Sequence, residues 1–455
     1  MRLYNTQSRS VEELAAEGEV KIYVCGVTPY SRSHLGHAMS AIVFDVLRRY
    51  LEFRGLRTLH VSNYTDIDDK LINRANETGT TVKDLAERHI AELEGEMEEL
   101  NVLPPHVRPR ATEEIAGMLD IIAGLVESGK AYESGGDVYY RVRTFPTYGS
   151  LSGKRVDELR SGARVEVGEL KEDAVDFALW KSAKPGEPSW DSPWGKGRPG
   201  WHIECSAMAI RYLGETLDIH GGGEDLIFPH HENEIAQSEA YTGKPFSHWW
   251  MHHGWMQLGG EKMSKSIGNI ISIEDGLRTY GADAIRLFVV NSHYRSPLVY
   301  SEEGLQAARS GAARLRQAAR RPGAPGGEGQ VDPEPFRGRF IEAMDDDLNT
   351  PRALASLFDL AREINKRIDD GALTEAAQGT LLELAGVLGL RLEEGQEGGD
   401  IGPFVELLIE LRADLRQKRE FELADRLRSR LSDLGVALED SPDGTTWRIE
   451  SLAGP

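Results

Sequence analysis

Four side chains of types that bind metal ions stand far apart in this 455-residue sequence. They are the only two cysteines, Cys25 and Cys205, together with His230 and Glu234. Pro229 can begin a helix, and four-residue spacing would then place His230 and Glu234 on one helix face. Two thiolates, one imidazole and one carboxylate can form a zinc site, and zinc can admit a further ligand. Each residue alone is more simply explained as a small buried hydrophobe or a surface side chain, so the prediction depends on the whole set.

Two short strings carry residue types suited to phosphate groups, namely His34-Leu35-Gly36-His37 and Lys262-Met263-Ser264-Lys265-Ser266. The first stands where a strand-end loop enters a helix, and backbone amides and the helix dipole attract anions at such a place. The second is a loop with two ammonium groups, and lysine is a point charge suited to phosphate oxygens. A histidine pair at a helix start is often structural and a Lys/Ser loop is often only solvated, so neither string is specific alone.

The positions of apolar residues predict the elements that hold these groups. Residues 20–24 alternate as in a strand that ends at Cys25, and residues 59–61 predict a second strand. Between them, helical spacing relates Val43, Val46, Leu47, Tyr50 and Leu51, and Gly55 closes the helix. A strand, a loop, a helix and a strand form the unit of parallel α/β sheets, which bind ligands at the carboxyl ends of their strands.

Composition divides the rest of the chain into an inserted region, a linker and a helical end. Short alternating pieces and several prolines predict an insertion at 121–199. Residues 321–335 are rich in Gly, Pro and Glu and predict a linker. Beyond the linker, the spacing of Leu and Ala predicts a mostly α-helical C-terminal third.

The overall composition limits what kind of protein this can be. An apolar fraction of 40% is enough for a folded core in each domain. Two cysteines in a chain of this size favour thiols or metal ligands over a disulfide. The net charge of -21 argues against a general basic coat for nucleic acid, so any RNA must meet local patches. The sequence lacks an apolar run of about 18 residues and a secretory pattern at its start, which predicts a cytoplasmic protein without membrane contact.

The two phosphate strings, in this order on an α/β scaffold, resemble the paired signature of class I aminoacyl-tRNA synthetases. Further strings resemble one family of that class, the bacterial-type cysteinyl-tRNA synthetases, along nearly the whole chain. They surround Cys25 and also cover Asn63–Lys70, Gly200–Ala209, Asp218–Glu234, Lys262–Ser266 and Tyr280–Asp283. The resemblance implies an α/β fold, with a Rossmann-like parallel sheet, an inserted connective domain and an α-helical C-terminal anticodon-binding region.

The same resemblance gives the expected domains their roles. The catalytic domain would comprise 1–120 and 200–260, and the connective insertion 121–199. A region with the Lys262–Ser266 loop and stem contacts would follow at 261–320, and the linker at 321–335. A helical bundle at 336–394 and an anticodon-binding region at 403–455 would complete the chain.

Site residues follow from the resemblance position by position. It implies that His34 and His37 stabilise the α-phosphate of ATP while Lys262 and Lys265 hold the leaving pyrophosphate, with His34, His37 and Lys265 as ATP-binding residues. It assigns one zinc ion per chain to Cys25, Cys205, His230 and Glu234. The substrate cysteine would be surrounded by Gly26, Thr65, Trp201 and Asp225.

Zinc would explain how cysteine is distinguished from serine. A pocket that relies on shape separates such near-isosteres by only about 100-fold. A thiol ionises near pH 8.5 and loses its proton on a metal, whereas an alcohol does not ionise comparably. The resemblance implies ATP-dependent ligation of L-cysteine to tRNA(Cys) through a cysteinyl-adenylate, with Mg²⁺-bound ATP as substrate. Selection by zinc further predicts that no editing domain is needed. As in bacterial relatives, the enzyme is expected to be a monomer.

Two local basic segments are candidates for tRNA contact. Residues 304–321 carry five arginines and no acid, a local charge of 5 - 0 = +5, and residues 412–430 carry seven basic and four acidic residues, or 7 - 4 = +3. Charged runs on helices are usually only solvated faces. The resemblance to the stem-contacting and anticodon-binding parts of bacterial relatives favours RNA. Trp447 would either stack on an unpaired base or anchor the end of the chain.

Two other functions stay open. Val27-Thr28-Pro29-Tyr30 departs from the Pro-Thr order of many family members and matches a sister family, the cysteine ligases of mycothiol synthesis, which join cysteine to glucosaminyl-inositol. Those ligases are shorter and lack a full anticodon-binding region, which favours the tRNA ligase. A noncatalytic, zinc-stabilised RNA-binding protein is the third alternative, and the intact phosphate strings argue against it. A persulfide-forming side activity also stays open, because Asn73 stands where relatives often have lysine.

Overall fold

The computed structural model describes residues 1–14, 18–158, 170–258, 261–262, 271–323, 330–393, 402–441 and 444–449. The chain forms two compact units, Met1–Glu393 and Glu394–Pro455. The domain boundaries expected from the sequence remain our proposal.

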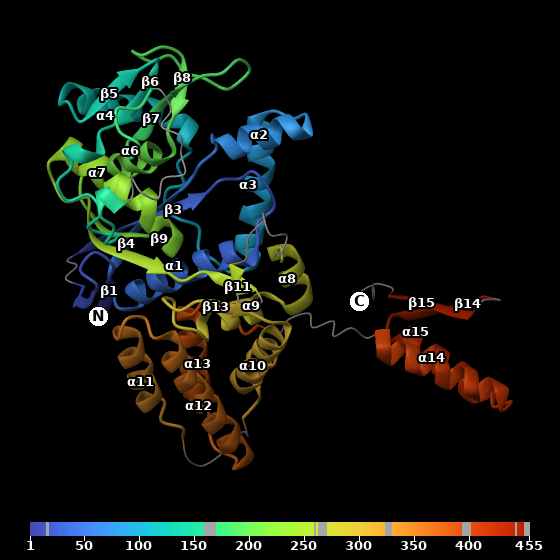
Figure 1. Ribbon diagram of the computed structural model, residues 1–455. Coiled ribbons are helices and arrows are strands. Elements are labelled where there is room, and N and C mark those ends of the chain that lie inside the picture. The colour runs from blue at the N-terminus through green and yellow to red at the C-terminus, as the bar shows by residue number, and fades with distance from the viewer. Residues whose placement is uncertain are drawn as a thin grey trace. The chain divides into compact units, whose positions relative to one another are not determined.

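A four-stranded parallel sheet in the order β10-β9-β3-β4 lies at the centre of the first unit (Figure 1). Its strands are β3 (Glu19–Val27), β4 (Arg57–Tyr64), β9 (Leu217–Gly223) and β10 (Ser247–His253). Helix α1 (Leu35–Phe53) connects β3 to β4, as the sequence predicts, and α7 (Glu232–Thr242) lies between β9 and β10. The connection through α1 leads from β3 to β4, and the connection through α7 leads from β9 to β10. In the sheet order, these two connections run in opposite directions, away from the boundary between β3 and β9. The carboxyl ends of β3 and β9 therefore border the crevice where such sheets bind ligands.

A separate antiparallel sheet occupies the region predicted as an insertion. It is formed by β5 (Ala131–Ser134), β6 (Asp137–Tyr140), β7 (Phe177–Ser182) and β8 (Gly197–Pro199), after helices α2 (Asp69–Thr78), α3 (Val82–Glu99) and α4 (Ile115–Glu127). The amide of Gly200 donates to Leu179 O at 2.8 Å, and α6 (Trp201–Leu213) begins at the next residue. The insertion thus fixes the start of the helix that carries Cys205.

Smaller strands and helices connect the sheet to a helical bundle. Strand β11 (Met256–Leu258) pairs with β12 (Glu261–Lys262) and with β13 (Leu298–Tyr300), and β1 (Arg2–Asn5) pairs with β2 (Ser10–Glu13). The helices are α8 (Ile273–Tyr280), α9 (Ala282–Val290), α10 (Glu302–Arg320), α11 (Glu334–Asp345), α12 (Thr350–Asp369) and α13 (Glu375–Val387).

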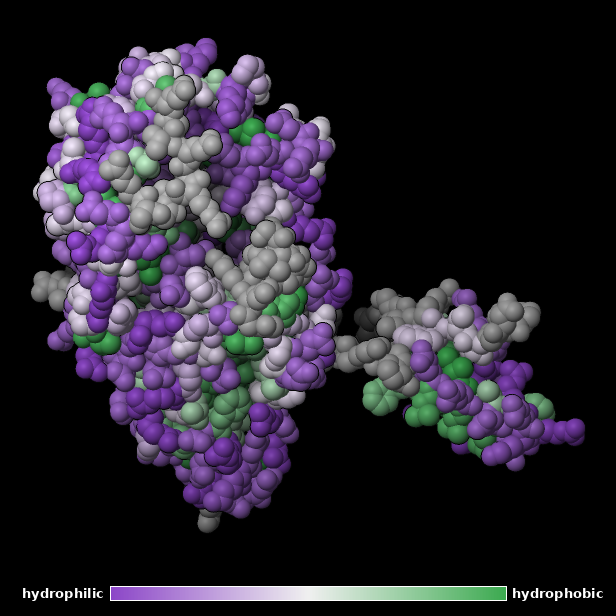
Figure 2. All heavy atoms as spheres, viewed as in Figure 1, coloured by the Kyte–Doolittle hydropathy of each residue, from purple (hydrophilic) through white to green (hydrophobic). Residues whose placement is uncertain are grey.

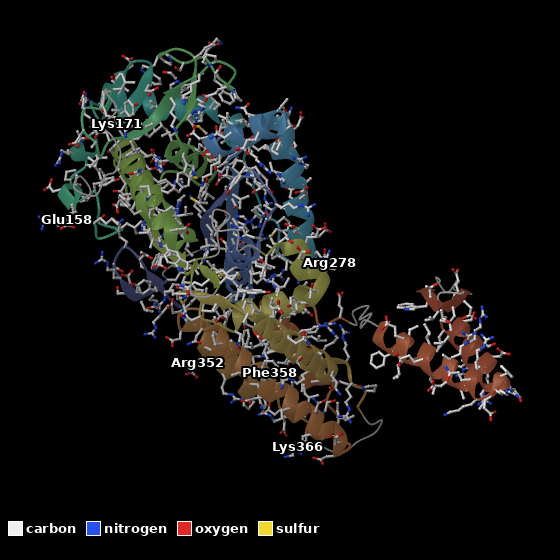
Figure 3. The ribbon with its side chains drawn as sticks, turned by 45° about the vertical axis from the view of Figure 1, so that its right-hand side comes forward. Glu158, Lys171, Arg278, Arg352, Phe358 and Lys366 are labelled. Atoms are coloured by element: carbon white, nitrogen blue, oxygen red, sulfur yellow. The ribbon has the colours of Figure 1, made fainter. Side chains whose placement is uncertain are left out.

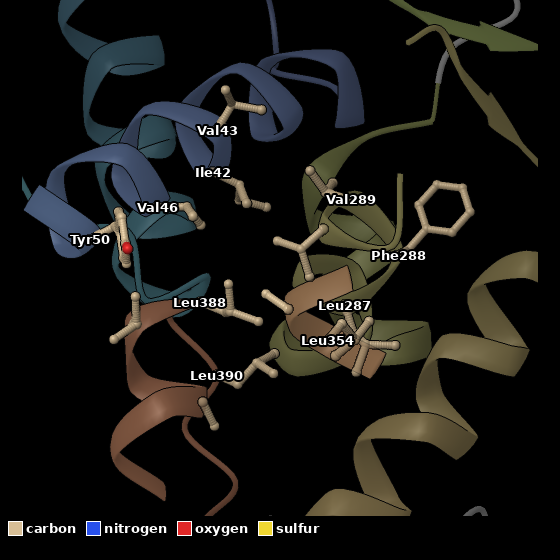
Figure 4. Packing of buried hydrophobic residues seen from close by; sticks show 14 of the residues in the cluster. Ile42, Val43, Val46, Tyr50, Leu287, Phe288, Val289, Leu354, Leu388 and Leu390 are labelled. Atoms are coloured by element: carbon tan, nitrogen blue, oxygen red, sulfur yellow. The ribbon is translucent and has the colours of Figure 1, made fainter. Parts of the chain in front are cut away.

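One apolar core joins α1 to the bundle (Figure 4). Ile42, Val46 and Tyr50 of α1 face Leu287 of α9 and Leu388, which follows α13. These side chains are fully or almost fully buried. The helix that begins at the His34 string is therefore held by the same core as the helical bundle.

The second unit is small and consists of two helices followed by a β-hairpin, so it is not purely helical. It comprises α14 (Gly402–Gln417), α15 (Phe421–Asp433), β14 (Val436–Ser441) and β15 (Gly444–Ile449). The prediction of a mostly α-helical C-terminal third is confirmed by α11–α15, although it did not include β14 and β15, which pair antiparallel. Trp447 packs against their small core of Val405, Leu431, Val436 and Leu438. Apolar side chains on α14 remain exposed (Figure 2); they include Phe404, Leu407 and Leu411.

Candidate active site and metal centre

A cavity of about 440 Å³ opens at the carboxyl ends of the central strands. Its wall includes Cys25–Thr28 at the end of β3, His34 and His37 at the start of α1, and Trp201 at the start of α6. Gly223, the last residue of β9, and Asp225, just after it, complete the side nearest Cys25. The cavity therefore joins the predicted phosphate string to most of the predicted cysteine-binding residues.

The four predicted metal ligands converge at one edge of this cavity. Cys25 comes from β3, Cys205 from α6, His230 from the helical turn Ile227–His231, and Glu234 from α7. One donor atom from each lies within 4.8 Å of the others. The Sγ atoms of the two cysteines are 3.7 Å apart, and Cys25 Sγ lies 3.4 Å from Glu234 Oε1.

The helix that carries Glu234 starts later than the sequence suggests. α7 begins at Glu232, and His230 belongs to the turn before it. The two side chains still meet, because His230 Nε2 lies 2.9 Å from Glu234 Oε1. The other ring nitrogen of His230 is 2.9 Å from His202 Nδ1. This contact orients His230 with Nε2 toward the other donors, as partners outside a metal site do.

Burial and mutual charge shift the pKa values of these four groups. Burial raises the pKa of Cys25 well above its usual value, whereas the hydrogen bond with Cys25 lowers the pKa of Cys205 to about 6. Burial alone would lower the pKa of His230, but the Glu234 carboxylate and Cys205 raise it to about 10. The two thiols thus behave as a pair that shares a proton.

The donor set fits a zinc ion. Cys205, His230 and Glu234 are at most 1% exposed, and Cys25 is partly open to the cavity. Glu234 Oε2 has no hydrogen-bond partner among the described residues. Thiolates, an imidazole and a carboxylate are the ligands that zinc prefers. A cation would satisfy the buried carboxylate and neutralise the thiolates, so we assign this cluster as the candidate metal centre.

Gly26 and Asn63 form the part of the wall next to Cys25. The amide of Gly26 donates to Asn63 Oδ1 at 2.9 Å, and Tyr23 Oη donates to the same oxygen at 3.1 Å. A Cβ on residue 26 would overlap the carbonyl oxygen of Asn63, so only glycine fits. Asn63 Nδ2 in turn lies 3.3 Å from Thr65 Oγ1, and Thr65 is buried.

Trp201 and Asp225 lie on the open side of the cavity. The indole of Trp201 stacks on His230 with ring centroids 4.2 Å apart and is 40% exposed, so it covers the metal centre from the solvent side. Asp225 is exposed at the cavity rim. Of the four residues expected around cysteine, Gly26, Trp201 and Asp225 line the cavity, whereas Thr65 supports the wall through Asn63.

The two histidines of the first phosphate string cap α1 reciprocally. His34 Nδ1 accepts a hydrogen bond from the Gly36 amide at 3.1 Å, and His37 Nδ1 accepts from the His34 amide at 3.2 Å. Their rings stack at 3.9 Å. In a neutral ring whose Nδ1 accepts, the proton is on Nε2, so both Nε2 atoms can donate to an anion at the helix start.

The second phosphate string lies mostly outside the described residues. The backbone of Lys262 belongs to β12, whereas the Lys262 side chain and all of Lys265 lie outside them. The chain is described again from Ile271, and this segment lies beside the first string. The Leu35 amide donates to Ile271 O at 3.1 Å, and Ser272 forms a bridge with His34.

A layer of buried histidines behind the metal centre was not predicted from the sequence. His220 Nε2 lies 3.6 Å from Cys25 Sγ and 3.3 Å from Glu234 Oε2. His231 and His252 lie behind it, with His231 Nδ1 2.8 Å from His252 Nε2. A single histidine followed by three glycines at the end of an apolar strand, His220–Gly223, could have drawn attention to His220.

The basic segment 304–321 is partly neutralised by other elements. Arg321 Nη2 lies 2.6 Å from Asp369 Oδ1, and Arg316 lies 3.7 Å from Asp283. The Arg314 guanidinium lies 5.3 Å from the ring centroid of Phe358 on α12, a helix with Arg352 and Lys366 near its two ends (Figure 3). The surface charge of the bundle is therefore less positive than the local count suggests.

Comparison with known proteins identifies the class and then the family. Residues 11–310 match the family described as tRNA synthetases class I (C) catalytic domain, and residues 339–393 match the DALR domain. Among solved structures, the methionyl-tRNA synthetase of Mycobacterium tuberculosis with methionyl-adenylate shares the fold, with a TM-score of 0.61 and 15% identity over 86% of this chain and 94% of that chain. Fold and catalytic-domain match define a class I aminoacyl-tRNA synthetase.

Full-length relatives narrow this class to one family. The cysteine–tRNA ligase of Dehalococcoides mccartyi is 53% identical over 99% of this chain and 100% of its own length. That of Thermococcus onnurineus is 48% identical over 99% of this chain and 100% of its own. The chain therefore belongs to the cysteine–tRNA ligase family and is an aminoacyl-tRNA ligase. Within the described residues, none of the helices combines the length and apolar character needed to span a bilayer.

Proposed function

We propose that this enzyme joins L-cysteine to tRNA(Cys) through a cysteinyl-adenylate and selects the substrate with one zinc ion. The observation that carries the proposal is the convergence of Cys25, Cys205, His230 and Glu234 beside a cavity that also contains His34 and His37. Full-length relatives that are cysteine–tRNA ligases support the same function. In this proposal Mg²⁺ enters with ATP.

The metal would be held by the two thiolates, His230 Nε2 and Glu234. When bound, zinc supplies a Lewis-acidic position at which a thiol ionises and an alcohol does not. Gly26 lets the backbone beside Cys25 approach Asn63 closely, because a Cβ there would overlap the Asn63 carbonyl. Trp201 covers the centre and excludes water, and the Asp225 carboxylate at the rim is suited to a substrate ammonium group.

The chain's own residues act on the phosphates by position and charge. A carboxylate oxygen of cysteine attacks the α-phosphorus of ATP, the bond to the β-phosphate oxygen breaks, and pyrophosphate leaves. The Nε2–H groups of His34 and His37 donate toward the α-phosphate as its charge develops. Lys262 and Lys265 would hold the pyrophosphate. A terminal ribose hydroxyl of the tRNA then attacks the cysteinyl carbonyl, and AMP leaves.

The remaining regions are proposed to bind tRNA. The helical bundle that includes the DALR match would meet the stem, and the second unit the anticodon. Trp447 packs on the core of that unit, which favours the anchoring role over base stacking. We also propose a cytoplasmic monomer, divided into domains as the sequence analysis expects. The DALR match and the full-length coverage by relatives argue against the shorter mycothiol ligases despite Thr28-Pro29-Tyr30.

The decisive experiment combines activation, charging and metal content. We expect cysteine-dependent exchange of pyrophosphate into ATP, no exchange with serine, and cysteinylation of tRNA(Cys). Glucosaminyl-inositol should not accept cysteine. His230→Asn should lose zinc and cysteine activation, while the matched surface variant His248→Asn should retain both, because His248 is exposed and is not among the metal-type donors. Retention of zinc by both variants would refute the metal assignment, and exchange without tRNA charging would refute the ligase function.

A further inference from the structure

A loop of the insertion packs on the segment that carries two of the proposed metal ligands. The loop comprises residues 147–154 and follows the short helical turn Val142–Thr144 after β6. It contacts residues 228–233, which lead into α7 and form its start. His230 and Glu234 face the metal centre, whereas the side chains beside them face the loop. The loop therefore contacts the ligand-bearing segment from the side opposite the metal.

Glu232 makes the main contact between α7 and the loop. Its side chain is 0% exposed, and its Oε1 accepts the Gly149 amide at 2.8 Å while its Oε2 accepts the Ser152 amide at 2.8 Å. Hydrogen bonds to a carboxylate are roughly twice as strong as those between neutral groups. The loop needs glycine at residue 149, because φ is +94° there and a Cβ would overlap the carbonyl oxygen of Lys154.

Two further side-chain contacts join the same two segments. Tyr148 Oη donates to Asn233 Oδ1 at 2.5 Å, and both side chains are buried. Lys154 Nζ lies 4.1 Å from the centroid of the Phe228 ring, which is within the range of a cation–π interaction. Contacts to the loop thus occur both before and after His230 in the sequence.

The start of α7 is not fixed by a cap of its own. Among the described residues, His231 at the N-cap position forms no capping side-chain hydrogen bond. The turn before it is interrupted at Phe228, where φ is -141° and ψ is 131°. A capping side chain commonly satisfies the free amides of a helix start and fixes it. The acids of the first turn point elsewhere, Glu232 to the loop and Glu234 to the metal donors, so the loop supplies the missing constraint.

We infer that the loop 147–154 positions the metal ligands, with Tyr148, Glu232 and Asn233 as positioning residues for the selection of cysteine. By holding the first turn of α7, the loop sets the direction in which the neighbouring ligands present their donor atoms. The inference rests on the proposed function and deepens it. Among the described residues that line the cavity, none of these three is found, so they act on cysteine only through the metal ligands.

The first test is Glu232→Gln, which replaces one acceptor oxygen by an amino group and leaves one loop amide without its partner. Loss of a partner outside the ligand set typically reduces metal affinity by about 10–100-fold. We expect such a reduction in zinc affinity, measured by competition with a chromophoric chelator, and a changed visible spectrum of the Co²⁺-substituted enzyme. In pyrophosphate exchange, KM for cysteine should rise by a similar factor while KM for ATP stays unchanged.

A pair of tyrosines gives a matched comparison. Tyr140 also donates from the insertion to α7, but to Ala236 O at 2.9 Å, beyond Glu234 in the helix. Tyr148→Phe and Tyr140→Phe each remove one buried hydrogen bond, so urea unfolding of the metal-free proteins should show similar losses of stability. Only Tyr148→Phe should weaken zinc binding and raise KM for cysteine, by about 10-fold.

Two outcomes would overturn the inference. If Glu232→Gln and Tyr148→Phe bind zinc and cysteine as the wild type does, the loop has a structural role alone. If both tyrosine variants lose zinc affinity equally, the effect is a general loosening of the insertion. Absence of zinc from the wild type would refute the proposed function, and KM for cysteine in the two tyrosine variants would then decide for or against the loop. If Glu232→Gln does not fold, the tyrosine pair decides alone.

Discussion

Two clusters of fully buried charge stabilise different parts of this enzyme, and they differ in how completely their polar atoms are paired. Arg286 on α9 is 0% exposed and pairs with Asp45 on α1, which is 2% exposed. Arg286 Nε donates to Leu388 O at 3.0 Å, and Nη1 donates to Leu100 O at 3.0 Å and Asn101 O at 3.1 Å. The guanidinium is thus surrounded by acceptors.

The carboxylate of this pair is equally satisfied. Asp45 Oδ1 accepts the Leu103 amide at 2.9 Å, and Oδ2 accepts from Arg49 Nε at 2.8 Å as well as from Arg286. Glu234 has the same chemistry and burial, yet its Oε2 is unpaired within the part of the chain that the structure describes. Complete pairing indicates a structural cluster, whereas unpaired atoms among thiols and imidazoles indicate a place for a ligand.

The position of each cluster agrees with this distinction. The Arg286 cluster connects α1, α9 and the end of α13 beneath the helix whose start carries His34. The metal centre borders the cavity at the carboxyl ends of the strands. The Arg286 cluster should therefore control stability, whereas the metal centre should control metal binding and activity. Separate measurements can distinguish these two effects.

The largest predicted effect is on stability, from Arg286→Met. The substitution leaves Asp45 buried without its main counter-charge and should lower the free energy of unfolding by about 3–5 kcal/mol. The additional change Asp45→Asn should restore at least half of this loss, because Asn removes the charge and keeps an oxygen for the Leu103 amide. Urea unfolding followed by circular dichroism measures both.

A surface arginine provides the matched control. Arg278 pairs with Asp275 on the outside of α8, where its side chain is 73% exposed (Figure 3). Arg278→Met should cost less than about 1 kcal/mol, as exposed pairs do. If the double variant is no more stable than Arg286→Met alone, the complete pairing of the cluster does not explain its role.

A smaller effect is predicted for Gly26→Ala, which changes the metal centre without removing a donor. The added Cβ would overlap the Asn63 carbonyl. Relieving the overlap should cost about 1–3 kcal/mol, which corresponds to a decrease of roughly 10–100-fold in kcat/KM for cysteine activation. Pyrophosphate exchange measures the loss. Gly95→Ala is the control, since a Cβ there meets nothing within 4 Å. Equal activity of the two variants would contradict the close fit at residue 26.

The difference between the clusters also explains what sequence could predict. Cys25, Cys205, His230 and Glu234 were identifiable because thiols are rare in this chain and the four types share one chemistry. His220 and His231 were missed, since a strand-end histidine and a neighbour of an assigned ligand have no distinctive spacing. The Asp45–Arg286 pair joins residues far apart in sequence, and no local pattern predicts it. Strands β14 and β15 were missed because each is short and has few large apolar residues, such as Val436 and Leu438 in β14.

Glu96 offers the smallest and most specific test, because one of its carboxyl oxygens is unpaired although Glu96 belongs to no metal-type donor set. Its Oε2 has no partner among the residues described, and burial together with the Glu92 carboxylate raises its pKa to about 7. The unfolded pKa of a glutamate is about 4.3, so the folded state binds the proton more tightly. Stability is therefore lost as pH rises from about 4.3 to 7, and the penalty is complete above 7.

Glu96→Gln should raise the free energy of unfolding at pH 8, measured by urea unfolding, and leave it nearly unchanged at pH 4. The gain at pH 8 should be less than about 1 kcal/mol, because solvent screens this half-buried group. Added zinc should not change the difference in stability between the wild type and the Glu96→Gln variant, since a lone carboxyl is not a zinc site. If zinc did change that difference, an unpaired buried oxygen alone would be enough to attract the metal.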